Sequence, residues 1–148
     1  IMALVTYFQN RKARPVKYAV VKHSSNTGVA SFTMIYTGIF IALFLVLHIK
    51  ALKFGHLGVV SYDGVEMADM YTLAASLFAD WMFSLFYAVA MVMVGLHVSH
   101  SVQSAAQTFG LNHSKYWTII QGASKCLGLL IGLGNIAITT IMFAKGAK

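Results

Sequence analysis

Three long apolar stretches dominate this chain of 148 residues. They cover residues 31–54, 81–106 and 116–143, and each exceeds the roughly 20 residues that a helix needs to cross a hydrocarbon core of about 30 Å. Backbone polar groups find no water to bond in lipid, so stretches of this kind form helices there. The sequence therefore predicts an all-α transmembrane helix bundle, with residues 1–148 forming a single membrane-anchor domain.

The composition agrees with a membrane protein. Hydrophobic residues make up 58% of the chain and charged residues only 10%, whereas about a quarter of an ordinary soluble domain is charged. The lone Cys126 excludes a disulfide framework, a cysteine-ligated iron–sulfur cluster and a cysteine-rich zinc site supplied by this chain alone.

The segments outside the three stretches also carry information. Residues 1–9 are apolar but too short to span a bilayer, and basic residues follow them, whereas a signal peptide has its basic residues first. We therefore interpret residues 1–9 as the end of a truncated upstream helix. A polar linker is expected over residues 10–30 and a long loop over residues 55–80, with a short interfacial helix at about 67–78 within that loop.

Charge placement predicts how the helices are oriented. The 10–30 linker carries five basic residues and no acidic one, and the short 109–115 turn adds Lys115. All four acidic residues lie in the 55–80 loop, namely Asp63, Glu66, Asp69 and Asp80. Because cytoplasmic loops carry an excess of lysine and arginine, we expect the linker and the turn in the cytoplasm. The long loop and the C-terminus then face outward.

Two histidines interrupt the apolar stretches. His48 lies 17 residues beyond Ser31, and His97 lies 17 residues beyond Asp80, so each is about 25 Å along its helix. The two helices run in opposite directions, which places the histidines near opposite faces of the membrane, about 15–20 Å apart in depth. An ionisable side chain is expensive there, and imidazole is a common ligand of haem iron.

The depth difference constrains any metal site. Two ligands of one metal ion lie only about 4 Å apart, at about 2 Å per bond, so His48 and His97 cannot share an ion. If both are ligands, two metal centres lie at different depths, and each needs a second axial ligand from upstream helices. The alternative is that each histidine only bonds to a neighbouring helix. The residues by themselves leave these two interpretations open.

Other polar and small residues have similar alternatives. His100 shares a helix face with His97 and is expected to reach towards the interface, while the remaining histidines, His23, His56 and His113, lie in loops. Two lysines, Lys50 and Lys53, lie at the end of the first span. They have two interpretations: they pair with haem propionates, or they extend to the membrane interface. The Gly128-xxx-Gly132 pattern indicates close helix packing.

At this point the chain resembles a known family. The stretches that carry the resemblance are QNRKARPVKY, MIYTGIFIALFLVLHI and FYAVAMVMVGLHVSHSVQSAAQTFGLNHSKY. They are similar to the di-haem cytochrome b membrane anchor of succinate:quinone oxidoreductases, a group that includes the succinate dehydrogenases and the fumarate reductases. The resemblance covers nearly the whole chain, and its third stretch is the most specific.

The resemblance implies a function. The family's anchor has five helices, and this chain corresponds to the end of the second helix and all of the last three. His48 matches the ligand of the distal haem b and His97 the ligand of the proximal haem b, with the second ligands on the first two helices. Such an anchor passes electrons between an iron–sulfur subunit and membrane quinone in a bacterial cytoplasmic membrane, as part of the respiratory chain and the tricarboxylic acid cycle.

The implied partners follow from the same resemblance. A flavoprotein subunit and an iron–sulfur subunit would dock on the basic cytoplasmic face and hold the FAD and the iron–sulfur clusters. Quinone and membrane lipid complete the set, and no nucleic acid is expected. No residue of this chain is expected to act on the dicarboxylate. One rival is a haem-free structural anchor; another is a small transporter, which the near absence of charge within the spans disfavours.

Overall fold

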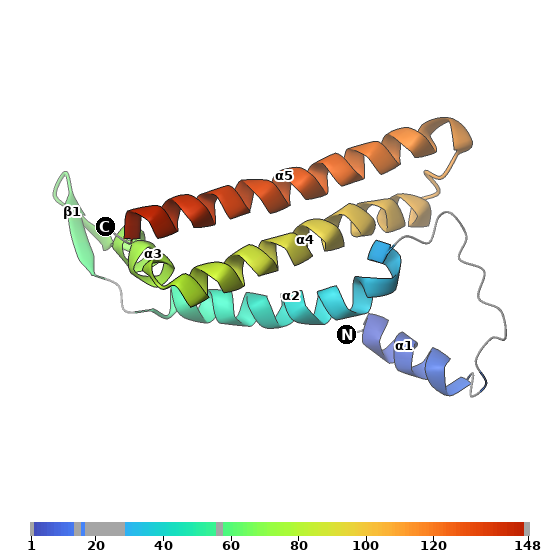
Figure 1. Ribbon diagram of the computed structural model, residues 1–148, viewed down its shortest axis with the longest axis horizontal. Coiled ribbons are helices and arrows are strands. Elements are labelled where there is room, and N and C mark those ends of the chain that lie inside the picture. Colours follow the sequence, from blue (N-terminus) through green and yellow to red (C-terminus); the bar gives the residue numbers. More distant parts are fainter. Residues whose placement is uncertain (1, 14–15, 17–28, 56–57, 147–148) are drawn as a thin grey trace.

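The computed structural model describes residues 2–13, 16, 29–55 and 58–146, with backbone alone for residues 3–4 and 29–32. Figure 1 shows an elongated arrangement of helices with one small antiparallel sheet. In chain order its elements are α1 (Met2–Ala13), α2 (Val29–Lys53), β1 (Val59–Tyr62), β2 (Val65–Ala68), α3 (Met70–Ala79), α4 (Trp81–Thr108) and α5 (Ser114–Gly146).

The expected fold class is confirmed. Within the described residues, three helical segments are long and apolar enough to cross a membrane, covering 33–53 of α2, all of α4 and all of α5. They contain 21, 28 and 33 residues, and each reaches the roughly 20 that a bilayer requires. The protein is therefore a helical membrane protein, and its helix ends lie within three residues of the expected 31–54, 81–106 and 116–143.

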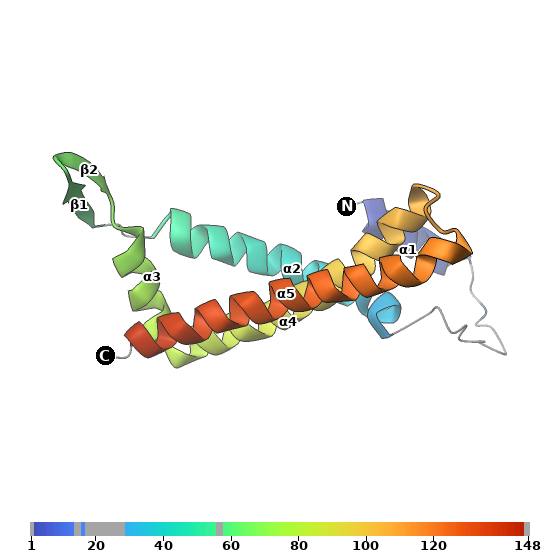
Figure 2. The same cartoon turned by 90° about the horizontal axis from the view of Figure 1, so that it is seen from above.

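α4 is the central helix of the bundle. It contacts α2 on one side and α5 on the other, and no comparable contact joins α2 to α5 in the described part of the chain. Figures 1 and 2 both show α4 and α5 running side by side in opposite directions. Much of α2 consequently presents apolar side chains to the surroundings, among them Leu43, Leu45 and Val46.

Glycines set the close approach of α4 and α5. A Cβ atom added to Gly95 would lie 2.7 Å from the carbonyl oxygen of Gly128 and 3.4 Å from the Cα of Gly132. Side chains at these positions would hold the helices apart, so the absence of a side chain allows backbone contact, as is common between membrane helices. The predicted packing role of the Gly128-xxx-Gly132 pattern is confirmed.

Aromatic side chains form the core where α2, α3 and α4 meet. Tyr87 is its hub, with ring centroids 4.5 Å from Phe83, 4.9 Å from Phe78 and 5.1 Å from Phe44. Most of these rings meet edge to face, the arrangement that the charge distribution of aromatic rings favours. The cluster holds the end of α2 near the 54–80 segment against α4.

The 55–80 segment contains more structure than a loop with one helix. β1 and β2 pair as a hairpin, and the expected interfacial helix begins at Met70 as α3. The hairpin was not predicted, although Asp63-Gly64 between two apolar runs is a strong hairpin signal. Both residues have positive φ, 48° and 81°, as the tight turn requires. Asp69 then caps α3 and Asp80 caps α4, each accepting a backbone N–H.

The first helix also differs from its predicted extent. The end of a helix was expected at residue 9, followed by a linker, but α1 runs through the basic residues to Ala13. Arginine and lysine are good helix formers. Arg11 and Lys12 also lie in the last turn, where positive charge is favourable. The remainder of the expected linker, apart from residue 16, lies outside the described residues until Val29.

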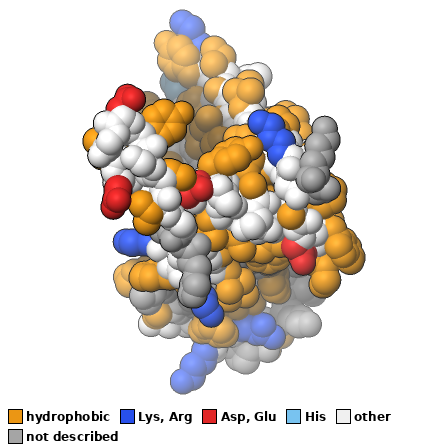
Figure 3. All heavy atoms as spheres, turned by 90° about the vertical axis from the view of Figure 1, so that its left-hand side faces the viewer, with side chains coloured by type: hydrophobic (Ala, Val, Ile, Leu, Met, Phe, Trp, Pro, Cys, Tyr) orange, Lys and Arg blue, Asp and Glu red, His pale blue; other side chains and the backbone are white. Residues whose placement is uncertain are grey.

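The two ends of the bundle differ in their acidic residues. The hairpin, α3 and the last turn of α5 lie at one end, and the α4–α5 turn lies at the other (Figure 1). All four acidic residues of the sequence belong to the first end, and Figure 3 views that end directly, with the acidic side chains in red. The structure thus separates the acidic loop from the turn with Lys115, as the charge pattern required.

Candidate functional site

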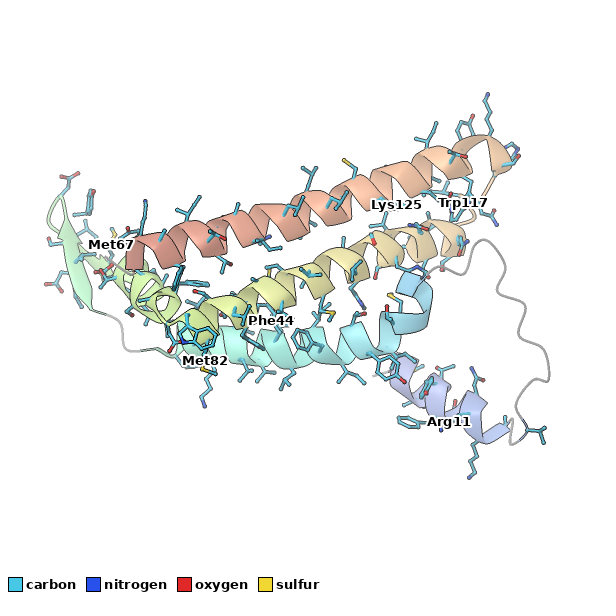
Figure 4. The ribbon with its side chains drawn as sticks, in the orientation of Figure 1. Arg11, Phe44, Met67, Met82, Trp117 and Lys125 are labelled. Carbon is cyan, nitrogen blue, oxygen red and sulfur yellow. The ribbon has the colours of Figure 1, made fainter. Side chains whose placement is uncertain are left out.

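His48 is held by a residue of another helix. Its Nδ1 atom lies 3.2 Å from the hydroxyl oxygen of Tyr87, which belongs to α4. The imidazole is half-buried, and its ring centroid lies 5.5 Å from that of Phe44. Figure 4 labels Phe44 between α2 and α4. The aromatic core therefore fixes the orientation of this histidine through Tyr87.

His97 belongs to α4 and is held by a residue of α2. Its Nδ1 atom lies 3.0 Å from the hydroxyl oxygen of Thr37, a side chain that is only 5% exposed. The α2 backbone approaches closely, since a Cβ atom added to Gly38 would lie 3.4 Å from Cε1 of His97. Each of the two histidines thus uses one ring nitrogen to join α2 to α4.

The hydrogen bonds of Thr37 are compatible with a tautomer of His97 that suits a metal ligand. The hydroxyl has one proton, and the backbone carbonyl oxygens of Thr33 and Met34 each lie 3.1 Å from its oxygen. When the hydroxyl donates to either carbonyl, its oxygen is left to accept from His97, and every group is satisfied. His97 then carries its proton on Nδ1, which leaves a lone pair on Nε2, and no hydrogen bond from the described residues reaches that atom.

The two histidines lie at different levels of the bundle. Thr37 marks the level of His97 on α2, and it lies 11 residues from His48. Tyr87 marks the level of His48 on α4, and it lies 10 residues from His97. Both intervals correspond to about 15–17 Å at 1.5 Å per residue. The histidines therefore cannot bind one metal ion together, in agreement with the depth difference expected from the sequence.

An open cavity adjoins the His48 end of the site. Its volume is about 530 Å³, and α2, α3 and α4 all contribute to its lining. Tyr87, the partner of His48, lines this cavity, and so does Lys50. Lys53 lies elsewhere, with Nζ 6.0 Å from the ring centre of Phe54. Lys50 is therefore the better placed of the two lysines to meet an acidic group bound beside Tyr87.

The remaining histidines are less engaged. His100 is half-buried and makes no hydrogen bond to a described residue. His113 is exposed and accepts from the backbone N–H of Lys115 at 3.2 Å, so it helps to shape the α4–α5 turn. His23 and His56 lie outside the described residues. Across the described part of the chain, no three histidine, cysteine or acidic side chains gather as a metal site.

Polar residues of α5 bond within their own helix. Asn135 donates to the carbonyl of Ile131 at 2.8 Å, and Thr140 to that of Ile136 at 2.9 Å. Thr139 is buried, at 5% exposed, and donates to the carbonyl of Asn135 at 2.9 Å. These residues therefore make no polar link between helices. Met142 packs against the aromatic core.

Sequence reasoning missed the two partner hydroxyls. Tyr87 and Thr37 are ordinary residues of apolar helices, and nothing in their local sequence marks them. The distance of each residue from its helix end could have indicated the Tyr87 pair. Tyr87 lies six residues after the start of α4, and His48 lies five residues before the end of α2. Antiparallel helices joined at that end bring these levels together, but only their relative rotation decides whether the side chains meet.

Comparison with known proteins gives no match, whether with protein-family models, with curated proteins or with solved structures.

Proposed function

We propose that this protein is a haem b-binding membrane anchor, with His48 and His97 as axial ligands of two separate haems. In this role it carries electrons between an iron–sulfur subunit of a succinate dehydrogenase or fumarate reductase and membrane quinone. Haem supplies a reversible one-electron centre at each histidine. Two centres at different depths divide an electron path across about 30 Å of hydrocarbon.

The hydrogen bond between Thr37 and His97 carries the proposal. Histidines that bind metals nearly always donate their second ring N–H to a fixed acceptor, which sets the tautomer and the ring orientation. When its hydroxyl donates to a carbonyl of its own helix, Thr37 provides that acceptor and leaves Nε2 of His97 with a lone pair suited to iron. Tyr87 occupies the equivalent position beside His48, and Lys50 lines the adjacent cavity, where it would meet a haem propionate.

In this proposal, residues of this chain orient the two ligands. The second axial ligands come from helices outside this sequence in the proposed complex. The flavoprotein and iron–sulfur subunits would dock on the face formed by the α4–α5 turn, which we assign to the cytoplasm because Lys115 is its only charged residue. The acidic 55–80 segment then lies outside a bacterial cytoplasmic membrane.

A haem-free structural anchor is the second candidate. Both histidines join α2 to α4, and such bonds by themselves stabilise packed membrane helices by about 0.6 kcal/mol on average. In that case the histidines need no metal. The two candidates differ in their optical spectra, since only the first has the absorption bands of haem.

A spectroscopic experiment tests the proposal. The assembled complex is purified, and a reduced-minus-oxidised spectrum is recorded together with the haem content per chain. His48→Ala and His97→Ala are each expected to remove about half of the haem, because an iron that loses an axial imidazole loses its main anchor. His113→Ala, at an exposed turn position, is the matched control and is expected to keep both haems.

The structural candidate predicts other results. It predicts wild-type protein without haem under full haem supply, and histidine variants that differ from it only by a small loss of thermal stability. Full haem occupancy in either His48→Ala or His97→Ala would contradict the ligand assignment.

A further inference from the structure

An open cavity lies in the groove between α4 and α5, and the haem proposal does not use it. Its volume is about 350 Å³. Its lining is apolar or small except for Ser99 and Lys125, and the Ser99 hydroxyl already donates to the carbonyl of Leu96 at 2.8 Å. Among the described residues that line this groove, the Lys125 ammonium is therefore the one charged group.

The depth of Lys125 in the membrane follows from the helix geometry. Lys125 and Lys145 both belong to α5 and are separated by 20 residues, which is about 30 Å of helix. The intervening residues carry no charge, and 30 Å is also about the thickness of the hydrocarbon core. The uncharged stretch between the two lysines thus matches the core in length, which places Lys125 near one boundary and Lys145 near the other. Figure 4 labels Lys125 towards the α4–α5 turn.

Among the residues that the structure describes, the ammonium of Lys125 has no counter-charge. The described residues offer it neither an ion pair nor a hydrogen bond. All four acidic residues of the sequence belong to the 55–80 segment, and the nearest of them to α4, Asp80, precedes Ser99 by 19 residues, or about 28 Å of helix. An anion that neutralises Lys125 must therefore come from outside this part of the chain.

The groove continues from Lys125 towards the membrane centre. Gly128 is level with Ser99 of α4, since its added Cβ atom would lie 2.8 Å from the Cβ of Ser99. Beyond it the cavity is lined by Leu129, Gly132 and apolar residues further along α5. A charged end at headgroup depth and an apolar channel towards the centre match the two parts of a phospholipid.

We propose that this groove binds one anionic phospholipid, with its phosphate on Lys125 and one acyl chain along the channel. Basic residues between helices at a membrane boundary attract anionic headgroups, and each contributes about fivefold to binding. A quinone carbonyl can accept a hydrogen bond from the ammonium but carries no charge to neutralise it, so the charge favours the phospholipid. The proposal does not depend on haem binding at His48 and His97.

Native mass spectrometry of the detergent-solubilised complex tests the proposal. The wild-type protein is expected to retain one phosphatidylglycerol per chain in preference to phosphatidylcholine of equal chain length. Lys125→Gln is expected to lower the retention of phosphatidylglycerol about fivefold. Lys145→Gln, at the other boundary of the same helix, is the matched control and is expected to change it little.

A second pair of variants tests the apolar channel independently of the Lys125 charge. Leu129 lines the groove and is 61% exposed, so Leu129→Trp fills the channel without entering the protein core and is expected to lower lipid retention. Ile138 is similarly exposed, at 58%, but does not line the groove, so Ile138→Trp is expected to retain the lipid. Thermal unfolding curves check that both variants fold.

Three outcomes would overturn the proposal. They are equal retention of the two phospholipids by the wild type, unchanged retention in Lys125→Gln, and displacement of phosphatidylglycerol by a short-chain naphthoquinone. The last outcome would assign the groove to quinone instead. Retention of phosphatidylglycerol in the presence of the naphthoquinone supports the phospholipid.

Discussion

Thr37 places one hydroxyl against the imidazole of a histidine on another helix. It is almost completely buried, at 5% exposed, and lies within hydrogen-bond distance of two backbone carbonyls and of His97 Nδ1. Because it has one proton, the hydroxyl either donates to a carbonyl and accepts from the imidazole Nδ1–H, or donates to Nδ1 itself. The proposed iron ligand requires the first arrangement. A single-residue change can therefore test the proposed ligand without touching the ligand itself.

Thr37→Val removes that hydroxyl while keeping the shape of the side chain. In the proposed cytochrome we expect the variant to bind the haem at His97 about 10- to 100-fold more weakly, as loss of such supporting hydrogen bonds typically does. We also expect a higher reduction potential for that haem, because an imidazole that loses its acceptor is less basic. Haem titration and a redox titration measure the two effects.

Thr37→Ser retains the hydroxyl and is the matched control, expected to behave like the wild type in both titrations. If Thr37 only links two helices, the valine variant loses a little thermal stability and the serine variant does not, with no spectroscopic difference between them. An unchanged reduction potential in Thr37→Val would thus count against the ligand role of His97.

Among the elements, the contact between α4 and α5 depends most directly on residue size. A Cβ atom at Gly128 would overlap the carbonyl oxygen of Gly95 and lie 2.8 Å from the Cβ of Ser99. A backbone carbonyl cannot move aside as a flexible side chain can. The helices themselves must therefore separate to admit even one methyl group.

Gly128→Ala is consequently expected to lower the free energy of unfolding by about 1–3 kcal/mol, the usual cost of overpacking. Gly134→Ala is the matched control on the same helix, because no atom lies within 4 Å of its added Cβ. It is expected to keep or raise stability, since alanine favours a helix over glycine by up to about 1 kcal/mol. Thermal unfolding in detergent compares the two, and equal losses would contradict the proposed contact.

The stability of α3 is expected to depend on pH through its N-cap residue, Asp69. Hydrogen bonds from the side chain and the backbone N–H of Thr72 lower the pKa of Asp69 below its ordinary value of 3.8. Asp69 is therefore more readily ionised in the folded state, so its stabilisation of α3 is complete above pH 3.8 and is lost as the pH falls below it. Hydrogen exchange of the Thr72 amide, corrected for intrinsic rates, is expected to show this loss.

Asp69→Asn keeps a capping side chain that does not ionise. Protection of the Thr72 amide in this variant is expected to be independent of pH over the same acidic range. A pH dependence that persists in the asparagine variant would have to come from another group.

For the whole molecule, the orientation in the membrane is the property to test. Ser61 in the hairpin and Asn112 in the α4–α5 turn are both exposed and lie at opposite ends of the bundle. With Cys126→Ala as background, a membrane-impermeant maleimide is expected to label Ser61→Cys in intact cells and Asn112→Cys only after permeabilisation. The positive-inside rule requires this pattern, and the reverse pattern would contradict the assignment of the two faces.

Much of the architecture was predictable from local sequence. The three spans, their antiparallel order and the separation of acidic and basic segments follow from the thickness of the bilayer and from the cost of placing charge in it. These constraints act on each segment separately, so no knowledge of neighbours is needed. The depths of His48 and His97 follow in the same way, because a helix advances by a fixed distance per residue.

Local signals also had limits near the membrane surface. The hairpin of β1 and β2 was not predicted, although Asp63-Gly64 is typical of its turn. The apolar runs on either side of that turn are short, so they were interpreted as part of a loop. The extension of α1 to Ala13 was missed because its basic residues were interpreted as a linker. In both cases the local sequence is compatible with two structures, a hairpin or a loop in the first and a helix or a linker in the second. The rest of the structure determines which one forms.

The sequence by itself determined that this is a helical membrane protein with two imidazoles at different depths. Only the tertiary structure decided that Thr37 and Tyr87 face those imidazoles, and that Lys125 flanks a groove left by Gly95, Gly128 and Gly132. The physical reason is that bilayer thickness and solvation set the limits and depth of each helix separately. Contacts between helices depend on their relative rotation and offset, which arise only when the side chains of both helices pack together.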